Sequence, residues 1–356
     1  MQEPKKGYLI PFSKGFDMTF YWAKTEGSDL GRNPKGRPNL QPKYLVSTKK
    51  NLRKPKYLRK FHQFDIEFKN DCKEGKLPNY VVIEQRYFDL FSIPANDDHP
   101  SHDVSQGQML VKEIYEALRA SPQWNQILFI ITYDEQGGFY DHVSTPVTGV
   151  PSPDDLVGPL PYYFNFDRLG VRVPAMFISP WIDRGTVLHG PSGPYPISEF
   201  EHSSIPATVK KIFNLKDFLN KRDAWAGTFD CVLNRTSPRT NCPVTLPEPV
   251  KMRDREAKEN EKLSDFQQEL VQMAATLNSD HRKDVYPHKL VEKMTVAEGA
   301  MYVENAFHKF RHECDKARAR GADDSEIVVV APTKRPPKAT SKSFAHKMFS
   351  CFVCNN

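Results

Sequence analysis

Residues 127–138 read ILFIITYDEQGG, and this stretch decides the fold class of the chain. Its apolar half predicts a buried strand, and a second apolar run at 173–179 predicts another. The short apolar run YVVIE at 80–84 ends in a carboxylate. Residues 105–120 place apolar side chains at helical spacing, which predicts an amphipathic helix. Buried strands that alternate with such helices predict an α/β fold, with a parallel sheet flanked by helices on both faces.

The carboxylates directly after the first of these strands are the strongest candidates for chemistry. In open α/β sheets, binding sites form at the carboxyl ends of strands. Asp134 and Glu135 would repel each other there unless a cation neutralises them, and oxygen ligands favour hard divalent metals. Gly137 and Gly138 allow a sharp turn, and an Asp-His pair follows at 141–142. We therefore predict a site at the two carboxylates; a solvated acidic turn is the alternative.

Two further clusters carry histidines just before predicted helices. His99 lies in NDDHPSHD at 96–103, and an imidazole near a helix N-terminus can contact a phosphoryl oxygen or act as a general acid. The alternative is a capped turn with Asp103 as the cap. His202 lies in EFEHSS at 199–204, where helix capping by a serine is again the alternative to a functional role.

The chain becomes helical beyond a proline-rich boundary near 245–250. The patterns S-x-x-Q at 264–267 and T-x-x-E at 295–298 are typical of capping boxes, and each opens a predicted helix. The second helix is expected to stop near Gly321. We expect the apolar stripes of both helices to pack on the main domain; the alternative is that they face a membrane.

The composition is that of a soluble globular protein, since 39% of the 356 residues are hydrophobic and 26% are charged. No apolar run approaches the roughly 20 residues that span a bilayer, and no secretory signal is found, so we expect a cytosolic protein. Residues 1–60 and 331–356 are basic, while the body between them is acidic. Basic ends attract phosphate groups, and the absence of a nucleic-acid-binding motif favours anionic lipid over nucleic acid. A solvated, flexible arm is the alternative for residues 1–60.

Two cysteines close to the end of the sequence, Cys351 and Cys354, lie among apolar residues beside lysines. Such cysteines are candidates for S-acylation, and a lipid chain combined with a basic patch gives a two-signal membrane anchor. The tail therefore predicts peripheral attachment to the cytosolic face of the plasma membrane. An unmodified tail is the alternative.

Several long motifs occur in the order in which a known family carries them. They are LPNYVVIEQRYFD (77–89), DDHPSHDVSQGQ (97–108), YDEQGGFYDHV (133–143), GVRVPAMFISPW (170–181) and EFEHSSIPATVKKIFNL (199–215). In these motifs the chain resembles the plant non-specific phospholipases C, which are related to bacterial phosphocholine-specific phospholipases and acid phosphatases. The resemblance extends over roughly residues 51–356.

The resemblance implies an alkaline-phosphatase-like α/β fold and a hydrolase that acts on membrane phospholipids. The implied reaction cleaves the glycerol–phosphate ester of phosphatidylcholine or phosphatidylethanolamine, giving diacylglycerol and a phosphorylated head group. Asp134 and Glu135 match the metal-binding pair of the family, which implies a divalent metal ion as cofactor. His99 matches the histidine that contacts the phosphoryl group, and His202 lies in the EHSS motif and is a second candidate catalytic residue.

Two family motifs are not found in this sequence: an asparagine-bearing motif like E-N-R-S-F-D-H and the T-x-P-N-R motif of the threonine nucleophile. We therefore expect an N-terminally shortened or divergent member with an incomplete sheet. A catalytically inactive relative that binds membrane lipids is the alternative. The predicted segments are an irregular, divergent basic segment (1–50), a phosphoesterase domain (51–249), a helical region (250–330) and a basic linker with the cysteine tail (331–356).

Overall fold

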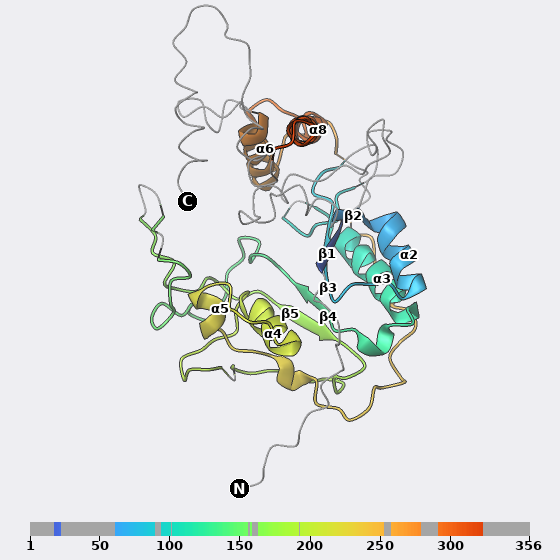
Figure 1. The fold of residues 1–356 in the computed structure, drawn as a ribbon, viewed down its shortest axis with the longest axis vertical. Helices are drawn as coiled ribbons and strands as arrows, with labels where there is room; N and C mark the ends of the chain where they lie inside the picture. Colours follow the sequence, from blue (N-terminus) through green and yellow to red (C-terminus); the bar gives the residue numbers. More distant parts are fainter. Residues whose placement is uncertain are drawn as a thin grey trace, which may run out of the picture. The chain divides into compact units, whose positions relative to one another are not determined.

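The computed structural model describes residues 18–22, 61–89, 94–100, 102–155, 157–158, 163–191, 193–252, 258–278 and 291–322. Figure 1 draws these residues as a coloured ribbon, and they divide into two compact units. The described residues of the first unit lie between Tyr115 and Leu246, and those of the second lie between residues 18 and 114 and between residues 247 and 322. The predicted linker and cysteine tail lie outside the described residues, and the division into four segments remains a prediction.

A three-stranded parallel sheet lies in the second unit. Its central strand is β1 (Met18–Trp22), with β2 (Phe61–Gln63) on one side and β3 (Tyr80–Glu84) on the other. β3 coincides with the apolar run of the sequence, whereas β1 corrects the prediction that residues 1–50 are irregular throughout. The segment around β1 is rich in Lys, Gly and Pro, and β1 is formed by pairing with strands far along the chain.

A helical connection joins β2 to β3. It consists of a single-turn π-helix, η3 (Phe64–Phe68), followed by α2 (Lys69–Glu74). Phe64 and Phe68 are buried, and their rings stack with 5.1 Å between centroids. Burial raises the pKa of the Cys72 thiol to about 12, so this cysteine acts as a packed apolar side chain rather than a nucleophile.

The predicted amphipathic helix at 105–120 forms as α3 (Val104–Ala120). Of the predicted apolar positions, Ile114, Tyr115 and Leu118 are buried and Val111 is half-buried. Their spacing places them on one face of the helix, as the sequence pattern required.

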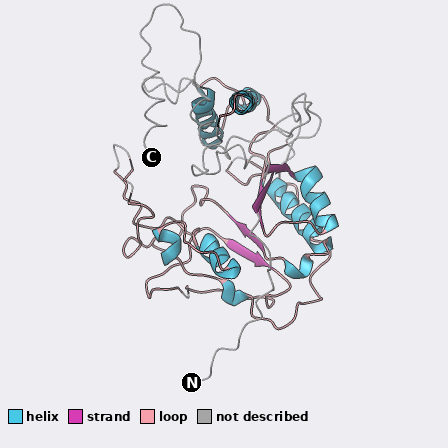
Figure 2. Cartoon of the chain, viewed as in Figure 1, coloured by secondary structure: helices cyan, strands magenta, loops and turns pink. Residues whose placement is uncertain are grey.

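The first unit is built around a two-stranded sheet accompanied by short helices (Figure 2). β4 (Phe129–Thr132) pairs with β5 (Ala175–Ile178), and α4 (Ser204–Phe213) and α5 (Lys221–Trp225) follow. The pairing is antiparallel, which corrects the predicted parallel sheet for these two strands. The residues described between β4 and β5 form no helix, and a parallel crossover is usually made by one.

Two capping boxes open the C-terminal helices, as the sequence predicted. Before α6 (Asp265–Asn278), Ser264 Oγ accepts from the Gln267 N–H at 3.2 Å, and Gln267 Oε1 accepts from the Ser264 N–H at 2.9 Å. Before α8 (Val296–Ala319), Thr295 forms the same reciprocal pair with the glutamate three positions on. Each box satisfies N–H groups that the first helical turn leaves without a partner, which fixes where the helix begins.

The two C-terminal helices pack on each other and on the segment that follows β3. Leu270 of α6, Val303 and Ala306 of α8 and Tyr87 share one buried cluster. Gln267 also donates from Nε2 to the Tyr87 carbonyl at 2.8 Å. The apolar stripes therefore pack inside the second unit, as predicted. In the described part of the chain, no helix is long and apolar enough to cross a membrane.

We predict that Gly299→Ala destabilises the chain at this helix packing. A Cβ at the buried Gly299 would lie 2.6 Å from Leu263 Cδ2 and 3.3 Å from Val271 Cγ2. Overpacking costs about 1–3 kcal/mol, more than the roughly 1 kcal/mol that alanine gains over glycine in helix propensity. Urea unfolding followed by circular dichroism measures the change. Met301→Ala, at an exposed position of α8, is the control. A variant as stable as the parent chain would contradict the packing argument.

Candidate active site

The two carboxylates predicted as the core of the site lie just past the end of β4. The strand ends at Thr132, and Asp134 and Glu135 are both exposed. Glu135 Oε2 accepts from the Gly137 N–H at 2.7 Å. Gly137 and Gly138 have φ values of 69° and 77°, in the left-handed region that favours glycine. The predicted sharp turn is therefore present, and it holds Glu135 by the backbone of its own loop.

His202 reaches this strand end from a distant part of the sequence. Its Nε2 lies 2.7 Å from the carbonyl oxygen of Tyr133, the residue before Asp134. A carbonyl oxygen only accepts hydrogen bonds, so Nε2 is the protonated nitrogen and donates. The lone pair of the neutral ring is then on Nδ1. The structure thus brings an imidazole of defined tautomer to the residue that precedes the carboxylate pair.

The capping alternative for the EFEHSS motif is not what the structure has. Ser203 occupies the N-cap position of α4 without a side-chain hydrogen bond to the helix. Ser204 Oγ instead accepts from the Glu201 N–H at 3.1 Å, which closes the turn that carries His202. Glu201 Oε1 is buried and has no hydrogen-bond partner among the described residues. The sequence analysis did not single out Glu201, although it stands next to His202 in the motif.

His99 lies in the second unit and is half-buried. Its ring stacks on Phe266 of α6, with 5.5 Å between centroids and 17° between planes. Its Nδ1 lies 3.1 Å from the Pro100 carbonyl, so Nδ1 carries the proton and Nε2 keeps the lone pair. The C-terminal helices, predicted only to pack on the main domain, therefore also support this imidazole.

A buried ion pair holds the loop that carries His99. His102 Nδ1 lies 2.8 Å from Asp97 Oδ1, and these side chains are only 9% and 3% exposed. The His102 N–H donates to the His99 carbonyl at 3.0 Å, which closes the turn. The largest single effect on the pKa of His102 is burial, which lowers the pKa. The hydrogen bond and charge of Asp97, together with the charge of Asp89, outweigh burial, so the pKa lies above its ordinary value of 6.5. The charge of Lys258 acts in the lowering direction.

The same loop is also tied at both of its edges. Asp89 is buried and accepts from the Ala95 N–H at 2.6 Å and from the Lys258 N–H at 3.0 Å. Asp103 Oδ1 accepts from the Ser105 N–H at 3.0 Å in the first turn of α3, so the predicted cap is present. Capping by Asp103 and presentation of His99 are thus compatible, because different residues of the loop serve each purpose.

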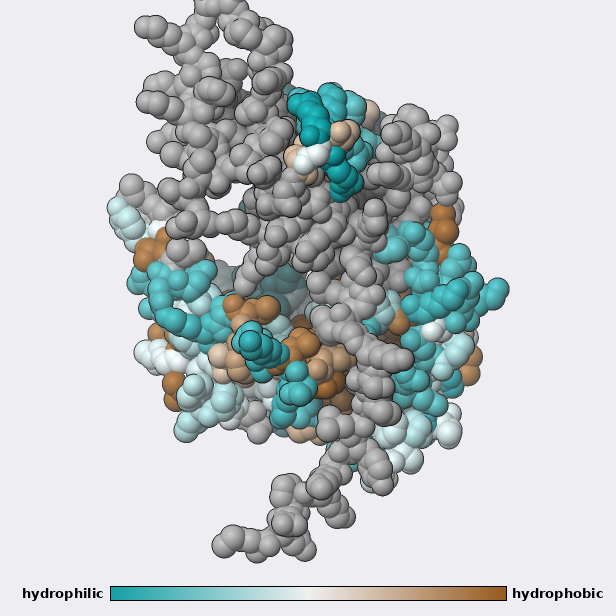
Figure 3. All heavy atoms as spheres, in the orientation of Figure 1, coloured by the Kyte–Doolittle hydropathy of each residue, from teal (hydrophilic) through white to brown (hydrophobic). Residues whose placement is uncertain are grey.

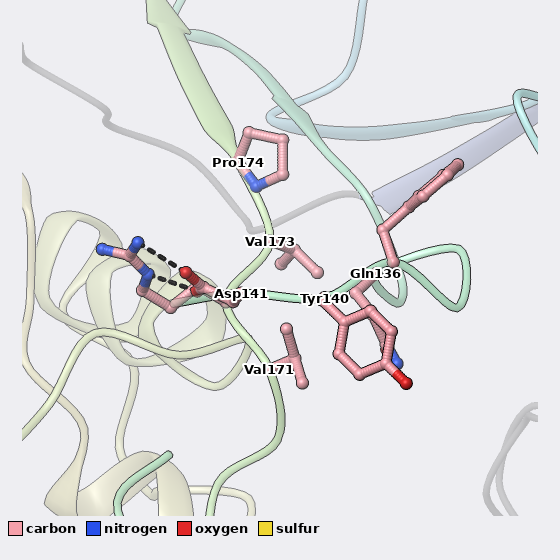
Figure 4. Close-up of a pocket in the computed structure, with 8 residues that line it drawn as sticks. Gln136, Tyr140, Asp141, Val171, Val173 and Pro174 are labelled. Carbon is pink, nitrogen blue, oxygen red and sulfur yellow. Dashed lines mark hydrogen bonds and ion pairs between the residues drawn. The ribbon is translucent and has the colours of Figure 1, made fainter. Parts of the chain in front are cut away.

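The Asp-His pair at 141–142 has a partner that the sequence analysis missed. Asp141 accepts two hydrogen bonds from Arg172, at 2.6 Å from Nε and 2.9 Å from Nη2 (Figure 4). The pKa of Asp141 is held well below its usual range, mainly by the hydrogen bonds from Arg172 and also by one from the Val143 N–H. Asp141 is therefore engaged in an ion pair, and a cavity of about 420 Å³ lies beside it. Its lining is Gln136, Phe139, Tyr140, Asp141, Val171, Arg172, Val173 and Pro174.

A model of the phosphoesterase family matches residues 13–216, more than half of the chain. The chain belongs to the phosphoesterase family. The match includes β1 and both strands of the first unit, together with the stretches that carry His99, the carboxylate pair and His202. The small sheets and flanking helices are consistent with an α/β phosphoesterase fold.

Curated relatives within this family include plant and bacterial phospholipases. The chain is 64% identical to "Non-specific phospholipase C3" of Arabidopsis thaliana over 310 residues, which are 86% of this chain and 59% of the relative. It is 62% identical to "Non-specific phospholipase C4" of the same plant, covering 85% of this chain and 60% of the relative. It is 31% identical to "Hemolytic phospholipase C" of Pseudomonas aeruginosa over 42% of this chain and 19% of the relative. The chain thus spans about 60% of the length of the plant relatives.

The phosphoesterase family is generally metal-dependent. Asp134 and Glu135 supply the carboxylate oxygens that fit a hard divalent ion. In the part of the chain that the structure describes, no group of three His, Cys, Asp or Glu side chains is placed to hold a metal. The pair would therefore provide only part of a coordination shell, which for such ions holds about six or more oxygens.

The predicted site residues are distributed over both units of this phosphoesterase. Asp134, Glu135 and His202 lie in the first unit, and His99 lies in the second. Cys351 and Cys354 lie outside the described residues. The roles assigned to these six residues from the resemblance remain predictions.

We predict that His102 makes the stability of the chain depend on pH. Its pKa is higher in the folded chain than in the unfolded one, so its ion pair with Asp97 contributes fully below about pH 6.5 and is lost as the pH rises through the folded pKa. The difference in unfolding free energy between the parent and His102→Gln should therefore shrink as the pH rises through this range. Urea unfolding at a series of pH values measures it. His189→Gln, at an exposed histidine, is the control, and a difference that does not change with pH would contradict the prediction.

Proposed function

We propose that this phosphoesterase carries the site of a phospholipase C-like phosphoric diester hydrolase. Its substrates are membrane phospholipids such as phosphatidylcholine and phosphatidylethanolamine, and its products are diacylglycerol and a phosphorylated head group. The hydrogen bond from His202 to the Tyr133 carbonyl carries this proposal, because it positions an imidazole next to the Asp134–Glu135 segment. Relatives that are 57–65% identical are called non-specific phospholipases C, which supports the same activity.

The reaction breaks the bond between phosphorus and the glycerol oxygen while an attacking hydroxyl oxygen bonds to phosphorus. If that hydroxyl belongs to a side chain, water then displaces it from phosphorus and releases the phosphorylated head group. A divalent ion held by Asp134 and Glu135 would supply positive charge to the phosphoryl oxygens. With its Nε2 proton engaged at Tyr133, His202 presents Nδ1, which can take the proton of the attacking hydroxyl or, once protonated, give a proton to the departing glycerol oxygen. His99 keeps the role that the family resemblance implies, contact with a phosphoryl oxygen. The finer description of the fold as alkaline-phosphatase-like belongs to the same proposal.

The proposal includes a membrane location. Membrane phospholipids are the substrates, and we place the protein at the cytosolic face of the plasma membrane. Acylation of Cys351 and Cys354, together with the basic residues of the tail, would supply the attachment.

We predict that Asp134→Asn reduces head-group release from phosphatidylcholine vesicles by about 100-fold or more, because it removes a charged oxygen ligand from the carboxylate pair. Release of phosphocholine is measured with added divalent ions and, in parallel, with a chelator. Asp217→Asn is the control, since it makes the same change in charge at an exposed position of the same unit.

The same assay separates the proposal from its alternative. Equal rates for Asp134→Asn and the parent chain would contradict the assignment of the carboxylate pair. If the folded parent chain binds vesicles but releases no head group under any metal condition, the catalytically inactive lipid-binding relative is the correct interpretation.

We predict thioester-linked acyl chains at Cys351 and Cys354 in protein purified from eukaryotic cells. Acyl-exchange labelling with mass spectrometry detects them, and the exposed Cys231 serves as the internal control that stays unlabelled. Replacing both tail cysteines by serine should move the protein from the membrane fraction to the soluble fraction, because one of the two attachment signals is lost. Absence of thioester at both cysteines would contradict the anchor.

A further inference from the structure

Two neighbouring aromatic side chains project from the loop that follows the carboxylate pair. In this loop, which we call the aromatic loop (residues 137–142), Phe139 is 70% exposed and Tyr140 is 104% exposed. Aromatic rings are normally among the most buried side chains, and a contiguous exposed apolar patch marks a surface that meets another phase or partner. Hydrophobic side chains also reach the surface over the part of the first unit that holds β4 and β5 (Figure 3).

The exposure is imposed by the backbone, since the aromatic loop is held at both ends. At its start, Gly137 and Gly138 make the left-handed turn whose first N–H binds Glu135. Near its end, Asp141 is bound by two hydrogen bonds from Arg172. A loop fixed in this way presents its rings to the surroundings at little further cost in conformational entropy.

The surface beside the rings is open and of mixed polarity. Figure 4 shows Val171 and Val173 on the side of Tyr140, while the Asp141–Arg172 ion pair points the other way. This alternation is that of an extended segment, in which successive side chains take opposite sides. Pro174 and Gln136 complete the lining next to the rings. The cavity therefore combines aliphatic carbon and aromatic rings with one neutral amide and the paired charges of Asp141 and Arg172.

These features fit the interfacial layer of a phospholipid bilayer. The tyrosine ring concentrates at the boundary between head groups and acyl chains, where its hydroxyl meets water and its body meets hydrocarbon. A phenylalanine beside it adds apolar area that is buried at the same boundary. The Asp141–Arg172 pair cancels its own charge, so a zwitterionic surface suits it better than an anionic one. The aromatic loop begins two residues after Glu135. When the rings of the loop enter a bilayer, the phosphate layer of that bilayer therefore lies next to the carboxylate pair.

We propose that the aromatic loop is a membrane-docking element that inserts Phe139 and Tyr140 into the interfacial layer of a zwitterionic phospholipid bilayer. The inference rests on the proposed function for the identity of the surface, and it adds a mode of attachment separate from the basic, cysteine-bearing tail. Docking through this loop would deliver phospholipid head groups to Asp134 and Glu135.

Flotation of the full chain with vesicles of pure phosphatidylcholine in high salt tests the proposal. High salt and a zwitterionic lipid suppress attraction through the basic ends of the chain. The variant is Phe139→Ser/Tyr140→Ser. The matched control is Val187→Ser/Leu219→Ser, two apolar side chains of the same unit that are 67% and 64% exposed. We expect the vesicle partition coefficient of the aromatic-loop variant to fall about tenfold or more, while the control floats like the parent chain.

Equal flotation of the aromatic-loop variant and the parent, or an equal loss in both variants, overturns the proposal. Sedimentation velocity without lipid gives a further outcome: self-association of the parent that only the aromatic-loop variant loses would make a second copy of the chain the partner instead. Flotation requires no turnover, so docking can be established even where no head group is released. A different result is that the parent chain releases phosphocholine while the aromatic-loop variant floats as well as the parent does. That result would support the proposed function and exclude the docking role of the loop.

Discussion

The antiparallel pairing of β4 with β5 sets the position of nearly every candidate group in the first unit. It ends β4 at Thr132, which leaves the Tyr133 carbonyl available to His202 and places Asp134 beyond the ladder. The pairing also sets where β5 starts. Arg172 lies in the segment just before β5, and the pairing therefore positions Arg172 to bind Asp141. Loss of this pairing would separate the imidazole from the carboxylates and Arg172 from Asp141, because the local turn at Glu135–Gly137 holds neither His202 nor Arg172 in place.

In the second unit, the corresponding constraint is the need to satisfy buried polar groups. Asp89 and Asp97 are almost fully buried, and a buried carboxylate is tolerated only with hydrogen bonds or an opposite charge. Their partners are backbone N–H groups of distant segments and the His102 ring. Meeting that requirement fixes the loop around His99, while Phe266 supports the imidazole from α6. Stability and presentation of a candidate catalytic group thus depend on the same bonds.

The sequence pattern predicted several helices, their caps and one strand correctly, because each of these depends on residues that are close together in the sequence. The S-x-x-Q and T-x-x-E boxes, the apolar face of α3 and the strand at 80–84 depend on residues within a few positions of one another, and each forms as expected. β1 escaped notice because it lies in a segment rich in Lys, Gly and Pro, and because its partners are strands far along the chain. Arg172 escaped notice because nothing in its own neighbourhood indicates that Asp141, far away in sequence, will bind it.

The sequence by itself determined the longer helices, the apolar strands and the chemical identity of the site: carboxylates and glycines after an apolar strand, and histidines before two helices. Those features follow from backbone propensity and side-chain chemistry, which act within a few residues. Only the tertiary structure decided that β4 and β5 run antiparallel, that His202 binds the Tyr133 carbonyl, and that Phe139 and Tyr140 face outward. These depend on which distant segments meet, and that is settled by burial and hydrogen bonding summed over a whole unit.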